Sequence, residues 1–292
     1  MALRELYGSS AWAHVGSPGS EPPLINCSVL FFMRISIIGS GNVATHIAAA
    51  LKNAGHKIVQ VYSRDMQNAA LLAYHVKAEP VDDLQHISNE TDIFIIAVKD
   101  DVIGLVAEQL AKHDKLMLHT SGATDMYALL AFTDKAGVLY PLQTFSKVKE
   151  VNFRQVPLCI EGADDGTTRQ IEELAQSISN NIYRVNSAQR KTLHLAAVFA
   201  CNFPNYLYEV ARQLLDAKGL DFELLRPLIL ETAEKVQERL PAQVQTGPAV
   251  RNDAGTMNNH LKLLEEMPHL QQIYTMLSQG IIKMDFTPPA HK

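Results

Sequence analysis

The most constraining feature of the 292-residue sequence is a glycine-rich turn between an apolar segment and an alanine-rich one. Residues 34–38 (Arg-Ile-Ser-Ile-Ile) have the pattern of a buried β-strand, and residues 42–53 that of a helix closed by Gly55. Between them stands Gly-Ser-Gly-Asn-Val-Ala, which fits the pattern GxGxxA. A strand, this turn and a helix in direct succession predict the phosphate-binding unit of a dinucleotide-binding α/β fold.

Each small residue of this turn has a physical role. Gly39 permits the tight turn, Gly41 has no Cβ to block a pyrophosphate, and Ala44 lets the helix pack closely on the strand. Backbone N–H groups at the helix start are free to bind phosphate. The candidate phosphate-binding residues are Gly39, Ser40, Gly41, Asn42, Val43 and Ala44.

Strand-like and helix-like segments alternate from Met33 to residue 186. The expected strands are 34–38, 57–62, 92–98, 115–119, 137–140, 157–161 and 181–185. The expected helices are 42–53, 67–75, one capped by Asp100 or Asp101 and running to about 112, 124–132 and 168–179. This alternation predicts a parallel sheet covered on both faces, in a Rossmann-type domain over 33–186.

After residue 186 the alternation stops. The expected helices are 187–218 (with a bend at Pro204), 222–239, 257–267 and 268–283, and no strand candidate follows. Residues 187–292 therefore form a predicted all-helical C-terminal domain. Residues 1–32 are rich in glycine, proline and serine without a regular period, which predicts a disordered tail or a start-site artefact before Met33.

Composition excludes several classes of protein. The chain has 26 Lys and Arg against 31 Asp and Glu, net −5, without the basic excess of a nucleic-acid binder. Its longest apolar runs, such as 195–201, fall far short of the roughly 20 residues that a membrane-spanning helix needs. Cys27, Cys159 and Cys201 are scattered, which disfavours a disulfide framework or a metal site and is typical of reduced cytoplasmic thiols.

The residues at the end of the second expected strand indicate whether NAD or NADP is preferred. NAD-preferring enzymes place an acid there to bind the ribose 2′-hydroxyl, whereas this strand ends in Tyr62, Ser63 and Arg64. The Arg64 guanidinium is suited to a 2′-phosphate, so the sequence predicts NADP(H). Asp65 would reverse the preference if it pointed inward in place of Arg64. The missing acid also disfavours an S-adenosylmethionine-dependent methyltransferase.

From Met33 to about Phe286 the sequence resembles the Rossmann-like proteins with a DUF2520 domain, relatives of pyrroline-5-carboxylate reductase and the β-hydroxyacid dehydrogenases. The resemblance rests on Gly39–Ala44, His119-Thr-Ser-Gly-Ala, Tyr140-Pro-Leu-Gln-Thr-Phe, His194-Leu-Ala-Ala-Val with Asn202-Phe, and Thr246-Gly-Pro-Ala-Val-Arg-Asn-Asp with His260. It implies an NADP-binding domain joined to a helical dimerisation domain. Asn252 stands where the family pattern has glycine.

Loops after the expected strands supply further candidates, because ligands bind at the carboxyl ends of parallel strands. The backbone of Ala97 and Val98 would line the nicotinamide ribose, and Lys99 would contact phosphate or substrate or remain a solvated lysine. Ser121 and His119 would bond the carboxamide or the substrate, or serve only the turn.

The long helix carries two polar candidates. His194 and Asn202 are eight residues apart, about 80° in azimuth on an ideal α-helix. We expect His194 to be a general acid, or alternatively a core histidine, and Asn202 to present its amide near the Pro204 bend. Where β-hydroxyacid dehydrogenases carry a catalytic lysine, this chain has Val198, so their lysine-assisted mechanism does not carry over.

By analogy with pyrroline-5-carboxylate reductase, the loop after residue 246 would bind a substrate carboxylate. Thr256 would offer a hydroxyl and free N–H groups, Arg251 a positive charge, and His260 would face the same pocket. Alternatively Thr256 is an N-cap beside a surface Arg–Asp pair. The substrate-binding candidates are Gly247, Pro248, Arg251, Asp253, Thr256 and His260.

Together these features predict an NADPH-dependent oxidoreductase that reduces a small carbonyl or imine substrate bearing a carboxylate. The resemblance further implies a homodimer. The competing hypothesis is a non-catalytic NADP-binding regulator, which the absence of the lysine favours.

Overall fold

The structure is a computed structural model that describes residues 32–284. It divides after Cys201 into two compact units, which are considered separately here. The tail predicted for residues 1–32 lies almost wholly outside the described residues. Helix α6 (Ser187–Ala197) belongs to the first unit, and the domain boundary near residue 186 stays a prediction.

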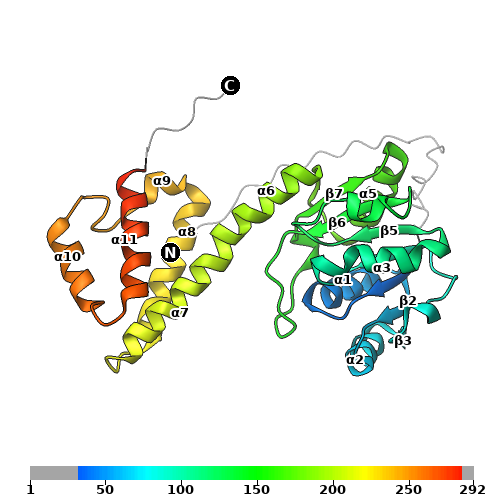
Figure 1. Cartoon of the computed structure of the whole chain (residues 1–292), viewed down its shortest axis with the longest axis horizontal. Helices are drawn as coiled ribbons and strands as arrows, with labels where there is room; N and C mark the ends of the chain where they lie inside the picture. Colours follow the sequence, from blue (N-terminus) through cyan, green and yellow to red (C-terminus); the bar gives the residue numbers. More distant parts are fainter. Residues whose placement is uncertain (1–31, 285–292) are drawn as a thin grey trace, which may run out of the picture. The chain divides into compact units, whose positions relative to one another are not determined.

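The first unit is a sheet covered by helices (Figure 1). Its strands are β1 (Arg34–Ile38), β2 (Lys57–Tyr62), β3 (Glu79–Val81), β4 (Ile93–Ile96), β5 (Leu116–His119), β6 (Ala136–Pro141), β7 (Leu158–Gly162) and β8 (Ile182–Arg184). Besides α6, its helices are α1 (Asn42–Asn53), α2 (Met66–Val76), α3 (Ile103–Leu110), α4 (Tyr127–Leu130) and α5 (Asp165–Ile178).

The eight described strands form one sheet in the order β3-β2-β1-β4-β5-β6-β7-β8. Strand β1 pairs in parallel with β2 on one side and with β4 on the other. Strands β2 and β3 are therefore added on one side of β1, and the strands from β4 onward on the other side. A ligand crevice is expected at this switch point, at the carboxyl ends of β1 and β4.

Both faces of the sheet are buried. On β4, Ile93 and Ile95 pack in one apolar cluster with α1, α2 and α5, whereas Phe94 and Ile96 pack in another with α3 and α4. Alternate residues of a strand point to opposite faces, so a strand covered on both sides reads as a continuous apolar run. This burial confirms the α/β class and the doubly covered sheet predicted from the sequence.

The sheet is mostly rather than wholly parallel. Strand β7 runs antiparallel to β6, with Gly137 opposite Gly162. The connection between them contains a 3₁₀ turn at Phe153–Gln155 but no crossover helix. A parallel return needs a crossover of a dozen or more residues that is usually helical, so the short elements here fit the antiparallel return that the strand pattern alone did not reveal.

Two helix predictions need correction. Asp100 and Asp101 do not cap α3, because they lie in a 3₁₀ turn, Asp100–Val102, and α3 begins at Ile103 without a side-chain cap. The single helix predicted for 187–218 is interrupted by a π-helical turn, Val198–Asn202, before α7 (Phe203–Asp216). Pro204 has no N–H to bond the Ala200 carbonyl, which explains why regular α-helical pairing fails there.

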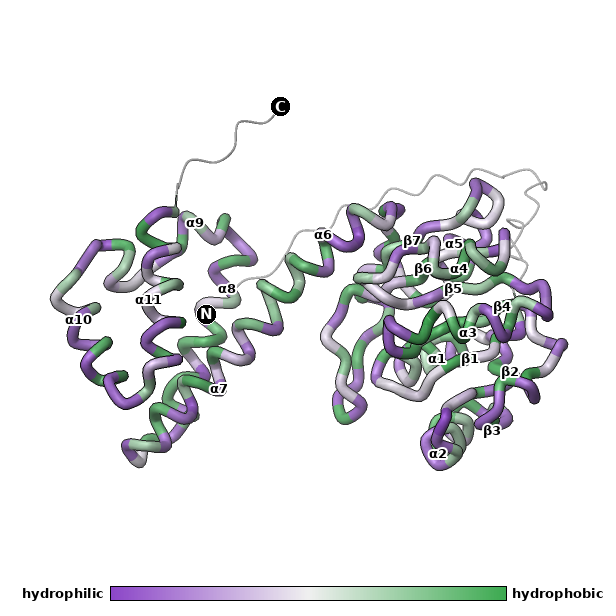
Figure 2. Tube along the Cα trace, in the orientation of Figure 1, coloured by the Kyte–Doolittle hydropathy of each residue, from purple (hydrophilic) through white to green (hydrophobic). Residues whose placement is uncertain are grey.

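Among its described residues the second unit contains helices joined by turns and loops and no strand, as predicted. After α7 it contains α8 (Arg226–Glu238), α9 (Pro241–Val244), α10 (Ala254–Leu263) and α11 (Pro268–Ile282). Hydrophobic and hydrophilic residues alternate along these helices (Figure 2). In the described chain as a whole, no helix is both long and apolar enough to cross a membrane.

Candidate functional site

The turn after β1 forms a cradle for an anion. Gly39 has φ of +125°, and a Cβ built on it would lie 2.2 Å from the Ala97 carbonyl oxygen, so only glycine fits. Gly41 is the N-cap of α1, with open space where a Cβ would stand. The helix has no side-chain cap and no acidic residue in its first turn. Its first N–H groups and positive dipole end are therefore available to phosphate.

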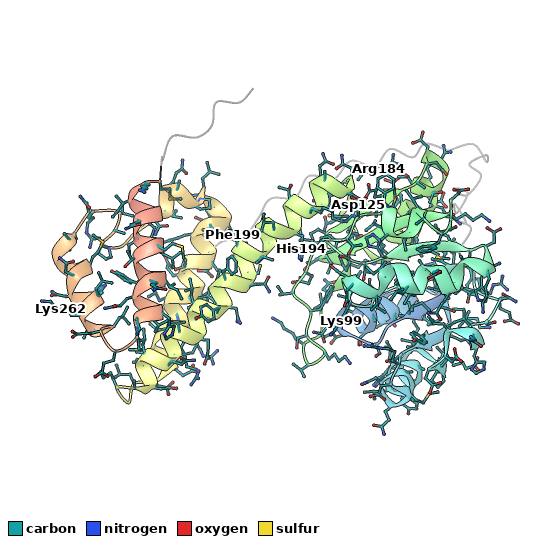
Figure 3. All side chains as sticks on the ribbon, viewed as in Figure 1. Lys99, Asp125, Arg184, His194, Phe199 and Lys262 are labelled. Atoms are coloured by element: carbon teal, nitrogen blue, oxygen red, sulfur yellow. The ribbon has the colours of Figure 1, made fainter. Side chains whose placement is uncertain are left out.

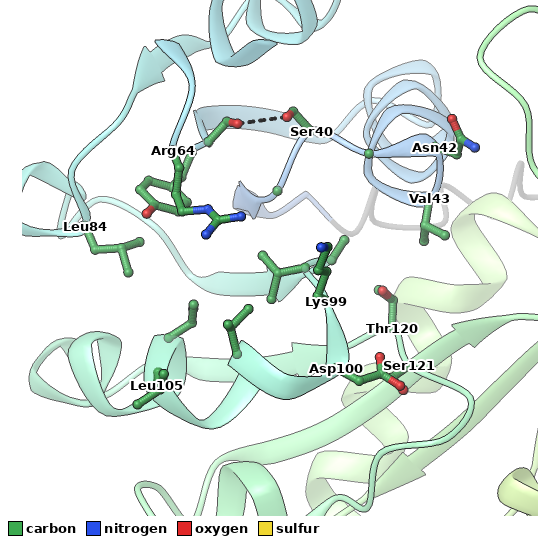
Figure 4. Close-up of a pocket in the computed structure, with 18 of the residues that line it drawn as sticks. Ser40, Asn42, Val43, Arg64, Leu84, Lys99, Asp100, Leu105, Thr120 and Ser121 are labelled. Atoms are coloured by element: carbon green, nitrogen blue, oxygen red, sulfur yellow. Dashed lines mark hydrogen bonds between the residues drawn. The ribbon is translucent and has the colours of Figure 1, made fainter.

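A cavity of about 590 Å³ begins at this cradle (Figure 4). Its lining comes from the glycine turn, the end of β2, the loop after β4, one face of α3 and the turn after β5. The sequence-predicted residues that line it are Gly39, Ser40, Gly41, Asn42, Val43, Ser63, Arg64, Ala97, Val98, Lys99 and Ser121. Ala44 is fully buried beneath the cradle, where its small side chain packs with the sheet core.

Arg64 stands at the end of β2, on the wall of the cavity (Figure 4). Beside it, the Ser40 hydroxyl donates to Ser63 Oγ at 2.9 Å and joins the glycine turn to the end of the strand. Asp65 faces elsewhere: it caps α2, and its Oδ1 accepts from the Gln67 N–H at 2.8 Å. The inward Asp65 that would have reversed the cofactor preference is therefore not observed.

The turn after β5 forms the opposite end of the cavity. Ser121 Oγ accepts from the N–H groups of Ala123, at 3.1 Å, and Thr124, at 2.9 Å. These bonds fix the oxygen but leave the hydroxyl proton available to a ligand. Ser121 thus lies on the wall with a donor to offer, whereas Thr120 beside it lines the same end.

His119 does not line the cavity but lies fully buried behind it. Its Nδ1 accepts the Ser121 backbone N–H at 3.2 Å. Burial, reinforced by the nearby positive charge of Arg190, lowers the pKa of His119 to about 3. A neutral ring with Nδ1 as acceptor carries its proton on Nε2. The structure therefore places His119 as a support of the Ser121 turn.

His194 lies on α6 (Figure 3), against the turn that contains Ser121. A Cβ built on Gly122 would be 2.7 Å from His194 Nδ1. The same Nδ1 is 3.1 Å from the Tyr140 hydroxyl. The structure thus brings His194 next to the Ser121 end of the cavity, although it is not itself among the lining residues.

A buried ion pair holds α6 to the sheet. Arg190 is fully buried and pairs with Glu161 of β7. Its Nη2 also donates to the Thr124 carbonyl, at 2.7 Å, and to the Ser187 hydroxyl, at 3.0 Å. Ser187 in turn donates its N–H and hydroxyl to the Glu161 carboxylate, each at 2.8 Å. The network joins β7, α6 and the turn after β5.

The remaining candidates lie in the second unit. Asn202 ends the π-helical turn, and the ideal-helix estimate of its azimuth from His194 does not apply, since a π turn rotates less per residue. Asn252 has φ of +50°, in the left-handed region that asparagine tolerates, which explains why it can replace glycine. His260 Nδ1 lies 2.8 Å from the Tyr274 hydroxyl.

The expectation for Thr256 needs correction. Asp253 is the N-cap of α10, and it accepts the Thr256 N–H at 3.0 Å and the Thr256 hydroxyl at 2.7 Å. These bonds lower the pKa of Asp253. Thr256 therefore has neither a free N–H nor a free hydroxyl for an anion. The substrate roles of Gly247, Pro248 and Arg251 stay predictions.

Sequence reasoning missed three residues of this region as site candidates: Tyr140, Glu161 and Arg190. Tyr140 belongs to a quoted motif, yet nothing in its neighbours along the chain indicates a partner 54 residues away. Arg190 falls within the helix predicted for 187–218, and no neighbouring residue indicates that it is buried. Only the burial of α6 against β7 turns it into an ion-pair partner. Among the described residues there is no group of three potential metal ligands.

Two family models match the chain in sequence. Residues 34–121 match a model described as NADP oxidoreductase coenzyme F420-dependent, and residues 156–281 match the domain of unknown function DUF2520. The first covers the glycine turn, Arg64 and Ser121. The second covers Glu161, Arg190, His194 and the helical unit. Among curated proteins, none matches the chain.

Solved structures extend this picture. A proposed NADP oxidoreductase from Bacteroides fragilis is 39% identical, with a TM-score of 0.82 over 87% of this chain and 100% of that one. The chain therefore belongs to this NADP oxidoreductase family, with an N-terminal Rossmann-type domain and a DUF2520 region.

More distant structures share the fold. An imine reductase from Myxococcus stipitatus in complex with NADP⁺ is 14% identical, with a TM-score of 0.65 over 85% of this chain and 92% of that one. A pyrroline-5-carboxylate reductase from Coxiella burnetii is 19% identical, with a TM-score of 0.51 over 86% and 96%.

Proposed function

We propose that the protein is an NADPH-dependent reductase of a small substrate with a C=O or C=N bond and a carboxylate. The observation that carries the proposal is the cavity at the carboxyl ends of β1 and β4 in the first unit. It runs from Arg64 past the uncapped N-terminus of α1 to Ser121, with His194 packed against the turn at that end. A phosphate-binding cradle, a cation and a candidate proton donor are thus combined in one domain.

The residues present fit NADP(H). The N–H groups after Gly41 would hold the pyrophosphate, and the first turn of α1 has no acidic side chain to repel it. Arg64 and Ser63, at the end of β2, would hold the 2′-phosphate. Ala97, Val98 and Lys99 would line the path between the pyrophosphate and the nicotinamide, and Ser121 would donate to the carboxamide or the substrate.

When bound, NADPH supplies a hydride. The protein has to orient the acceptor carbon, exclude water and provide a proton to the heteroatom. His194 is the residue that we propose to hold this proton. Asn202, through its amide, and Arg251, through its charge, stay sequence-based proposals for substrate binding in the second unit. Val198 stands in place of a catalytic lysine, so His194 is the proton donor that we propose on α6.

The proposal is tested by binding and turnover together. We expect the protein to bind NADPH more tightly than NADH and to oxidise NADPH in the presence of some member of a panel of cyclic imines and 2-keto acids. The readouts are nicotinamide fluorescence and absorbance. Tight NADPH binding with no turnover on any member would contradict the reductase and favour the non-catalytic regulator.

The cofactor preference is tested by Arg64→Ala. A hydrogen-bonded charge pair is worth about 1.5–3 kcal/mol, so the variant should bind NADPH about 10- to 100-fold more weakly. NADH affinity should not change, because NADH has no 2′-phosphate. Arg154→Ala, in the 3₁₀ turn before β7 and outside this cavity, is the control. Equal affinity of the wild-type protein for NADPH and NADH would contradict this role of Arg64.

We further propose that the second unit pairs with a second copy of this chain. The described residues from 202 onward bury few large apolar side chains, Leu264 and Leu270 among them, although four helices of ten or more residues are present. Many others are exposed: Leu220, Leu224, Leu228, Leu230, Val236, Leu240, Leu263, Met276 and Leu277. Apolar surface of this extent marks an interaction site. The commonest assembly of soluble oligomers is a twofold homodimer, so we take a second copy of the chain as the partner.

This dimer is tested by sedimentation. The wild-type protein should sediment at twice the mass of the chain. Leu224→Lys combined with Leu228→Lys should shift it towards the monomer, because each lysine would have to be desolvated in the interface. Leu71→Lys, at an equally exposed position on α2, should leave the mass unchanged. A wild-type monomer at micromolar concentration would contradict the proposal.

A further inference from the structure

Tyr140 and His194 form a contact that the proposed function does not yet use. Tyr140 is the fifth residue of β6, and His194 lies in the second half of α6. The Tyr140 hydroxyl is 3.1 Å from His194 Nδ1, and the two rings meet edge to face with centroids 6.0 Å apart. Tyr140 is buried, with 9% of its surface exposed, whereas His194 is partly exposed. The bond thus joins a side chain of the sheet to one at the surface of the unit.

Gly122 makes this contact possible. A Cβ on Gly122 would lie 2.7 Å from His194 Nδ1 and 2.8 Å from Tyr140 Cζ, closer than real Cβ atoms approach. The Tyr140–His194 pair therefore occupies the space that any side chain at position 122 would need. Because Ser121 is the preceding residue and lines the cavity, the pair lies directly behind the end of the cavity that is remote from Arg64.

We propose that Tyr140 is a positioning residue that fixes the ring of His194 by donating its hydroxyl to Nδ1, leaving Nε2 as the nitrogen that exchanges a proton with the substrate. The proposal rests on the proposed function of His194 and extends it. Tyr140 acts through His194 and does not itself touch the substrate.

The surroundings of Tyr140 support the direction of this bond. Burial raises the pKa of Tyr140 to about 12, so the phenol keeps its proton at physiological pH. The charged and titratable groups that face it are the Cys159 thiol on β7 and Arg190 on α6, the second of which opposes the rise. Burial also raises the pKa of Cys159, so that neighbour stays neutral. A phenol that keeps its proton is able to donate to Nδ1 of His194, and in that arrangement the ring proton is on Nε2.

The kinetic test is Tyr140→Phe, which removes the hydroxyl and keeps the ring. Loss of one hydrogen bond corresponds to about 0.5–1.5 kcal/mol, so kcat should fall about 3- to 10-fold while KM for NADPH is unchanged. In a His194→Gln background the same substitution should have no further effect, because Tyr140 acts only through His194. Tyr127→Phe, at an exposed position, is the matched control. Equal losses in both backgrounds would overturn the proposal.

A second test does not need turnover. Diethyl pyrocarbonate acylates the free lone pair of a neutral imidazole, and in the wild-type protein that lone pair of His194 is held by the Tyr140 hydroxyl. Mass spectrometry should show acylation of His194 rising about 3- to 10-fold in Tyr140→Phe, with exposed His269 as the internal reference. An unchanged rate would overturn the proposal. One further outcome is that the wild-type protein reduces no substrate while the acylation rate of His194 still rises in Tyr140→Phe. In that case the proposed function fails and the positioning of His194 by Tyr140 stands.

Discussion

Gly39→Ala should be the most damaging single-methyl substitution in the sheet domain. Its Cβ would lie 2.2 Å from the carbonyl oxygen and 2.8 Å from the carbonyl carbon of Ala97, both backbone atoms at the end of β4. The φ of +125° adds strain for any residue other than glycine. Because β1 and β4 are central strands, the backbone cannot move without disturbing the core. We expect the free energy of unfolding to fall by about 3–5 kcal/mol, measured by urea denaturation.

Gly41→Ala is the matched control, since it adds the same methyl group two residues away. Gly41 has ordinary extended dihedral angles, and nothing lies within 4 Å of the added Cβ. The free energy of unfolding should therefore change by less than about 0.5 kcal/mol. NADPH affinity should nevertheless fall at least about tenfold, because the methyl group occupies the approach of the pyrophosphate. Equal stability losses in the two variants would contradict these separate roles.

The sequence predicted some elements to the residue and others poorly. The bounds of β1, α1 and β2 agree with prediction because the apolar pattern, the glycine turn and Gly55, with φ of +96°, all act within a few residues. The three-residue strand β3 was missed, since it contains Pro80 and is defined only by pairing with β2. The antiparallel direction of β7 is likewise a property of pairing with β6 rather than of its own residues.

The residues of the candidate site likewise fall into those that the sequence predicted and those that it did not. The cavity lining was predictable because the ends of parallel strands meet at one edge of a sheet, and most candidate cofactor residues do lie there. The placement of the residues packed behind the cavity wall, namely His119, Tyr140 and Arg190, was not predictable from the sequence. His119, which follows a strand like the others, has its ring buried beneath Ser121, and only the fold shows which way a strand-end side chain points. Tyr140 and Arg190 depend on α6 packing against the sheet, which no local pattern encodes.

Arg190 is the residue of α6 that binds this helix to β7 and to the turn after β5. No part of its surface is exposed, and the side chain of Glu161 is only 15% exposed. Removing one partner of a buried ion pair leaves the other charge without compensation, which costs about 3–5 kcal/mol. Here the loss would include the bond to the Thr124 carbonyl, which secures the turn that carries Ser121 and Gly122.

Arg190→Met should therefore lower the free energy of unfolding of the sheet unit by about 3–5 kcal/mol, measured by urea denaturation. Lys191→Met is the matched control at the next position of α6. Lys191 pairs with Asp125 at 2.8 Å, but both side chains are more than one-third exposed, so the change should be below about 1 kcal/mol. Adding Glu161→Gln to Arg190→Met should restore part of the loss, since it removes the uncompensated carboxylate. A loss in Arg190→Met no larger than in Lys191→Met would show that the buried pair does not hold α6 to the sheet.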